Sequence, residues 1–183
     1  MSKNLNDWKR FQNEHFPGVL GAELFDHVVG DMLGQGADRT VFEYMPDETC
    51  VIKFTNRRGS FQNVHEWDVW QQHSAGKGTS TLKWLAPCVS ISHSGNILIQ
   101  KRTKPVPFSR RLPKMVPNIL CCDMKRENWG IFRGRLVCHD YGRHDAIFYA
   151  SKGRNMDKAT WIDAANGCFD PKFGETGATG LVI

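Results

Sequence analysis

The sequence predicts a single α+β domain built from short antiparallel hairpins and a few helices. Several short runs of β-branched and aromatic residues are separated by glycine, proline, asparagine and aspartate, the pattern of strands joined by tight turns. Between two such hairpins lies a stretch with apolar residues at threefold spacing, which is typical of an amphipathic helix. The chain has 183 residues, 40% of them hydrophobic, enough for one domain with its own core.

The first half of the chain predicts helices around a hairpin. Apolar side chains at spacings of three and four indicate helices over 4–15, 21–29 and 61–73. The β-branched and aromatic runs over 40–44 and 50–54 indicate two strands joined by a turn that contains a proline. A glycine-rich turn precedes the first of these strands, and the region from 28 to 54 is expected to form a hairpin.

The second half predicts two further hairpins with less regular structure around them. The expected hairpin strands are 89–92 with 97–100 and 130–132 with 135–138. The segment 103–117 carries four prolines and is expected to be a linker. Beyond the last hairpin the signals weaken, and we expect a helix over 157–166 and a flexible glycine-rich stretch over 174–180.

Composition narrows the classes of function. Lys and Arg number 24 against 19 Asp and Glu, a formal net charge of +5, in short clusters rather than one tract. A nucleic-acid partner is therefore not expected. No stretch is apolar enough for a membrane helix and no apolar leader is present, so we expect a cytoplasmic protein without a membrane partner. The six cysteines lack zinc-ligand spacing, and reduced thiols are expected.

Candidate phosphate-binding residues lie in the first half of the chain. Gly34 and Gly36 stand between two predicted strands, where bare backbone amides can approach a polyphosphate. Lys53 follows two apolar residues in a strand and, if buried, needs an anionic partner. Glu66, near the apolar face of the third predicted helix, is the candidate partner, with Asp68 as the competing acid. The alternatives are an edge-strand lysine that reaches solvent and a solvent-facing glutamate.

Candidate transfer residues follow in the second half. Asp123, Lys125 and Asn128 are closely spaced, and Asp140 comes just after the last predicted hairpin. In phosphoryl transfer, Asp123 would accept the proton of the attacking hydroxyl and Lys125 would neutralise charge on the transferred group. Asn128 and Asp140 would hold magnesium through hard oxygen ligands.

These motifs, in this order, resemble the protein kinase superfamily over residues 30–142. The resemblance implies ATP and Mg²⁺ as cofactors. The residues it assigns to nucleotide binding, through the glycine loop, the lysine and the backbone of a hinge, are Gly34, Gly36, Val41, Lys53, Gln100, Lys101 and Arg102. It places Glu66 on a helix C, Asp123 and Lys125 in a catalytic loop, and Asn128 and Asp140 on the metal, with Asp140-Tyr141-Gly142 matching Asp-Phe-Gly.

The resemblance also divides the chain and shows departures. It implies an antiparallel-sheet N-lobe with a helix C and an N-terminal helix over about 1–102, and a reduced C-lobe over 103–183. Arg39 replaces the third loop glycine, and Cys121-Cys122 replaces the His-Arg pair before the catalytic aspartate. In its compactness the chain is similar to small viral or phage kinases.

The expected function is that of a minimal serine/threonine protein kinase. Two alternatives stay open. One is a pseudokinase-like binding or inhibitor protein that docks a partner protein through the basic segment 101–114. The other is a small-molecule phosphotransferase. Apolar surface left exposed by the short C-lobe would permit a homodimer.

Overall fold

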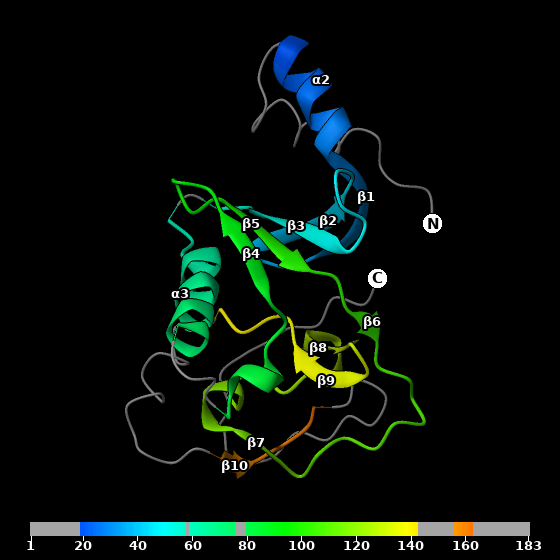
Figure 1. Cartoon of the computed structure of the whole chain (residues 1–183), viewed down its shortest axis with the longest axis vertical. Helices are drawn as coiled ribbons and strands as arrows, with labels where there is room; N and C mark the ends of the chain where they lie inside the picture. Colours follow the sequence, from blue (N-terminus) through cyan, green and yellow to red (C-terminus); the bar gives the residue numbers. More distant parts are fainter. Residues whose placement is uncertain (1–18, 58, 76–79, 143–155, 163–183) are drawn as a thin grey trace, which may run out of the picture.

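Five antiparallel strands form the main sheet of the protein, in the order β1-β2-β3-β5-β4 (Figure 1). The computed structural model describes residues 19–57, 59–75, 80–142 and 156–162. The strands are β1 (Val29–Gln35), β2 (Arg39–Tyr44), β3 (Cys50–Thr55), β4 (Cys88–Ile91) and β5 (Ile97–Lys101). The predicted α+β class and the two predicted hairpins of this region are confirmed. The helix expected over 4–15 and the stretch 174–180 lie outside the described residues.

Helix α2 (Val19–Val28) packs against one face of the sheet through Phe25. Its Phe25 is fully buried, and the Phe25 ring centre lies 6.4 Å from that of Phe42 and 6.3 Å from that of Phe54. Phe42 in β2 and Phe54 in β3 lie on the same face of the sheet. The residues next to each of them along its strand therefore face the other way. The helix predicted over 21–29 is confirmed with slightly earlier bounds.

Helix α3 (Gln62–Ser74) lies against the other face and confirms the helix predicted over 61–73 (Figure 1). The stripe it buries differs from the threefold apolar pattern. Asn63, Glu66 and Val69 are the buried residues of the helix, whereas Phe61, its N-cap, is exposed. The opposing strands present charged groups here, so the polar residues Asn63 and Glu66 take inward positions. Their hydrogen-bond and ion-pair partners therefore determine which face of α3 is buried.

The second part of the described chain is built from short elements below the main sheet in Figure 1. Strands β6 (Lys104–Pro105), β8 (Trp129–Phe132) and β9 (Arg135–Cys138) form one sheet, and β7 (Met115–Pro117) pairs with β10 (Met156–Lys158). Short 3₁₀ turns connect them: η1 (Leu82–Trp84), η2 (Asn118–Leu120) and η3 (Arg126–Asn128). The hairpin predicted from 130 to 138 is confirmed as β8–β9.

Two expectations for this part are corrected. The segment 103–117 is not simply a linker, because it contains β6 and β7 and buries Val106 and Val116 in the core. The helix expected over 157–166 is wrong in its described part, where β10 forms instead. There the backbone pairs with β7, and Trp161 packs with its ring centre 5.2 Å from that of Trp129, so tertiary contacts outweigh the local helical pattern.

Two further properties of the described residues bear on the sequence-based expectations. No helix in the described ranges is long and apolar enough to cross a membrane. The five cysteines of those ranges are free thiols, in agreement with the expectation for them, and Cys168 lies outside the described residues.

Candidate functional site

A lysine and a glutamate meet beneath the main sheet. Lys53 is in β3, which has a neighbour on each side and is buried along its whole length. Its Nζ lies 2.6 Å from Oε1 of Glu66 in α3. The predicted pair therefore forms, and the alternative of an edge-strand lysine reaching solvent does not hold. Asp68, the competing acid, is exposed on the outer side of α3.

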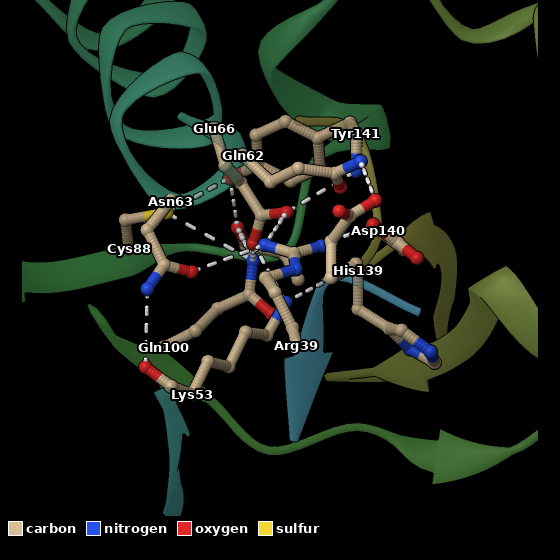
Figure 2. A network of polar contacts seen from close by, with 12 residues as sticks. Arg39, Lys53, Gln62, Asn63, Glu66, Cys88, Gln100, His139, Asp140 and Tyr141 are labelled. Atoms are coloured by element: carbon tan, nitrogen blue, oxygen red, sulfur yellow. Dashed lines mark hydrogen bonds and ion pairs between the residues drawn. The ribbon is translucent and has the colours of Figure 1, made fainter. Parts of the chain in front are cut away.

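Glu66 is the centre of a buried network (Figure 2). Its carboxylate has no exposed surface and accepts hydrogen bonds from four groups. Besides Lys53, these are Nε2 of Gln100 at 2.8 Å, a guanidinium nitrogen of Arg39 at 2.9 Å and the backbone N–H of Tyr141 at 3.3 Å. A buried carboxylate is stable only when hydrogen bonds and ion pairs replace its lost hydration. Through these partners Glu66 links β2, β3, β5 and the segment after β9.

Arg39 joins this network from the start of β2. Its side chain is buried, with one nitrogen on Glu66 and the other on a carboxylate oxygen of Asp140 (Figure 2). Burial alone would lower the pKa of Arg39, but the carboxylates of Glu66 and Asp140 outweigh it and raise the pKa. Burial would raise the pKa of Asp140, and the charges of Arg39 and Lys53 overcome this and lower it.

The role of Arg39 was missed from the sequence, where it was interpreted only as a replaced glycine. The available signal was strand parity. Arg39 stands two residues before Val41, and alternate residues of a strand share a face. Val41 in turn pairs with Lys53 across β2 and β3, so both Arg39 and Val41 belong to the face that looks toward α3.

Three of the predicted nucleotide-binding residues lie in one cross-strand row. Gly34 is paired with Val41, and Val41 is paired with Lys53. Directly paired residues of antiparallel strands present their side chains on the same face. Because Gly34 has no side chain, the row is open at this end. A Cβ at Gly34 would meet no atom within 4 Å, and one at Gly36 only a carbonyl oxygen at 3.8 Å. Packing within the described chain therefore does not require either glycine.

Gly142 differs, because packing does require it. A Cβ there would overlap the backbone carbonyl of Gln62 in the first turn of α3. Its small size lets the segment after β9 press against α3, where Tyr141 N–H reaches Glu66 and the Tyr141 hydroxyl donates to the Ala86 carbonyl at 2.7 Å. The position of Asp140 is thus tied to the position of α3.

The predicted transfer residues gather beside the β8–β9 hairpin. Nδ2 of Asn128 donates to the Asp123 carbonyl at 3.1 Å, and Nζ of Lys125 lies 3.3 Å from Oδ1 of Asp123. The backbone N–H of His139 donates to the Asn128 carbonyl at 2.9 Å. This bond places Asn128 next to the residue that precedes Asp140. Because the carbonyl of His139 also accepts a hydrogen bond from Lys53, the two halves of the predicted site are adjacent.

His139 holds three segments of the site together and was not identified from the sequence. One ring nitrogen, Nδ1, is 2.8 Å from Oγ1 of Thr103, and Nε2 is 2.8 Å from the Glu127 carbonyl. Its own carbonyl accepts a hydrogen bond from Lys53. Burial, and then the charge of Lys53, lower the pKa of His139 to about 4. Its ring is therefore neutral near pH 7, with the Nε2 proton donated to Glu127.

The stability of the protein should fall on acidification because of His139. The unfolded residue takes up a proton near pH 6.5, whereas the folded residue does so only near 4. Between these values the unfolded state binds more protons, so stability is lost as the pH falls, by at most ~1.4 kcal/mol per pH unit. Urea unfolding at several pH values should show a shallower pH dependence for His139→Gln than for the unchanged protein. An equal pH dependence of stability in the two proteins would show that His139 does not cause the loss.

Several hydrogen-bonding groups of the predicted hinge residues already have partners within the protein. The backbone N–H of Lys101 donates to the Pro87 carbonyl and that of Arg102 to the Thr49 carbonyl, both at 2.8 Å. The side chain of Gln100 points to Glu66, and its Oε1 is buried without a hydrogen-bond partner among the described residues. Adenine recognition by these residues stays a prediction.

Asn128 and Asp140 are the residues that could hold Mg²⁺. Magnesium commonly uses one or two carboxylates and completes its shell with water and substrate phosphates, so this small set of oxygen ligands fits the ion. The Asp140 side chain is 38% exposed, with one of its oxygens paired to Arg39. Within the described ranges, no three His, Cys, Asp or Glu side chains gather into a larger metal site.

No protein-family model matches the chain, and no curated protein matches it significantly.

Proposed function

We propose that the protein binds ATP with Mg²⁺ in this site and transfers the γ-phosphoryl group to a serine or threonine hydroxyl of a protein. The observation that carries the proposal is the buried pair of Lys53 and Glu66, with Asp140 held beside it by Arg39. Burying a lysine, an arginine and a glutamate together is costly, and a site for a polyanion gives such an arrangement a use.

The order of elements supports a kinase-like arrangement within the α+β fold. A helix, α3, is inserted between the third and fourth strands of the antiparallel sheet and carries the glutamate that meets the β3 lysine. The hairpin β8–β9 then separates Asn128 from Asp140. In this proposal, residues up to about 102 form the nucleotide-binding lobe and the later residues a reduced second lobe.

Each residue has a chemical task in the proposed reaction. The open row at Gly34 admits the phosphates, and the ammonium of Lys53, oriented by Glu66, pairs with them. Asp123 orients the attacking hydroxyl and accepts its proton, while Lys125 offsets charge on the transferred group. When bound at Asn128 and Asp140, Mg²⁺ would neutralise phosphate charge.

Nucleotide binding tests the proposal directly. The unchanged protein should bind ATP with Mg²⁺ in isothermal titration calorimetry, and Gly34→Val should weaken binding by at least about tenfold, ~1.4 kcal/mol. A side chain at Gly34 has room in the protein, so the variant should keep its thermal stability. Leu33→Ala is the control, because Leu33 is adjacent in β1 and exposed. Failure of the unchanged protein to bind millimolar ATP would contradict the proposal.

A second candidate is a kinase-like binding protein without transfer activity. The ion pair of Arg39 with Asp140 favours it, since the proposed metal ligand is already neutralised. This protein would bind a partner protein and show no transfer. ATP binding without phosphorylation of any protein substrate, including itself, would favour the second candidate over the first.

A further inference from the structure

One arginine contacts both carboxylates of the site, the buried Glu66 and the partly exposed Asp140. The two terminal nitrogens of Arg39 divide between Glu66 and Asp140, and the first of them also lies 3.3 Å from Oδ1 of Asn63. Arg39 is only 6% exposed. A planar guanidinium with several fixed donors suits such a bridge better than an ammonium would.

The charges of this cluster balance without a metal ion. Two cations, Lys53 and Arg39, face two carboxylates, Glu66 and Asp140. Lys53 and Arg39 share Glu66, whereas Asp140 has Arg39 as its ion-pair partner. Removing the arginine charge would leave two carboxylates against one ammonium, an environment that attracts a divalent cation.

Arg39 and a divalent cation would compete for the same carboxylate. The guanidinium occupies one oxygen of Asp140, and its charge lies within a few ångströms of any ion on the other oxygen. In a partly buried site the repulsion between two such cations is only weakly screened. The charge of Arg39 therefore weakens metal binding at Asp140.

We propose that Arg39 is an internal competitor of the metal ion at Asp140 and so sets the metal affinity of the site. The inference rests on the proposed function in taking Asp140 as the metal ligand. A bound metal weakens the Arg39–Asp140 pair, while Glu66 and Asn63 keep the arginine within the site. Arg39 thereby controls how tightly the site binds the metal ion.

The test is a titration with Mn²⁺ alone, read by electron paramagnetic resonance, without nucleotide. Arg39→Gln should raise the affinity for Mn²⁺ by about tenfold or more, ~1.4 kcal/mol. Adding Asp140→Asn to this variant should abolish the gain. Arg57→Gln is the matched control, because Arg57 is 72% exposed and lies 3.7 Å from Asp38, and it should leave the affinity unchanged.

A second variant covers the case in which Arg39→Gln does not fold. Arg39→Lys keeps a positive charge near Glu66 but cannot bridge both carboxylates with one planar group, so it should also raise the Mn²⁺ affinity, by a smaller factor. An unchanged or lower affinity in the folded variant, or a gain that persists with Asp140→Asn, would overturn the inference. Because no nucleotide is present, this result is separate from a failure to bind ATP, which would instead contradict the proposed function.

Discussion

Replacing Glu66 by alanine should destabilise the protein by about 3–5 kcal/mol, the usual cost of removing one partner from a buried ionic network. The substitution would leave the buried groups of Lys53 and Gln100 without their carboxylate acceptor and take one of two anions from Arg39. It would also remove the acceptor of the Tyr141 N–H. The free energy of unfolding, measured by urea denaturation at pH 7, gives the size of the loss.

Asp68→Ala is the matched control for this loss. It removes a carboxylate from the same helix, two residues away and exposed, so it should change the stability by no more than about 0.5 kcal/mol. Glu66→Gln keeps the shape and one acceptor oxygen but not the charge, and an intermediate loss is expected. If Glu66→Ala were no more destabilising than Asp68→Ala, Glu66 would not be the centre of the network.

Replacing Asp123 by asparagine should lower kcat for phosphoryl transfer by about 10²–10⁴, the usual contribution of a general base. Asparagine preserves the shape of the side chain but cannot accept the proton of the attacking hydroxyl. The fold should survive, because the Asp123 side chain is 20% exposed and its ion pair with Lys125 is near the surface. Transfer from radiolabelled ATP to the protein itself or to a general protein acceptor measures the effect, with thermal unfolding measured in parallel.

Glu127→Gln is the control for the Asp123 experiment. Glu127 is exposed and belongs to the same short turn, and its contact with His139 uses its backbone carbonyl rather than its side chain. The variant should therefore retain both transfer and stability. Transfer retained in Asp123→Asn would show that another group accepts the proton, whereas equal losses in both variants would indicate a general disturbance of the turn.

Both of these predictions depend on residues that were identified from local sequence patterns. Lys53 was recognised from its apolar neighbours in a strand, and Glu66 from its place near the apolar residues of a helix. The pairing of these two residues is confirmed. The hairpins of the main sheet and β8–β9 were also predictable, because β-branched runs and turn residues act over a few positions of the chain.

The sequence by itself thus determined the α+β class and most of the strands, and it made Lys53 and Glu66 candidate partners. Only the tertiary structure decided that α3 buries polar residues, that 156–158 form a strand, and that Arg39 and His139 belong to the site. The physical reason is the same in each case. The partners of these residues are far away along the chain, as Asp140 is from Arg39, and ion pairs or backbone pairing with them outweigh the local preference.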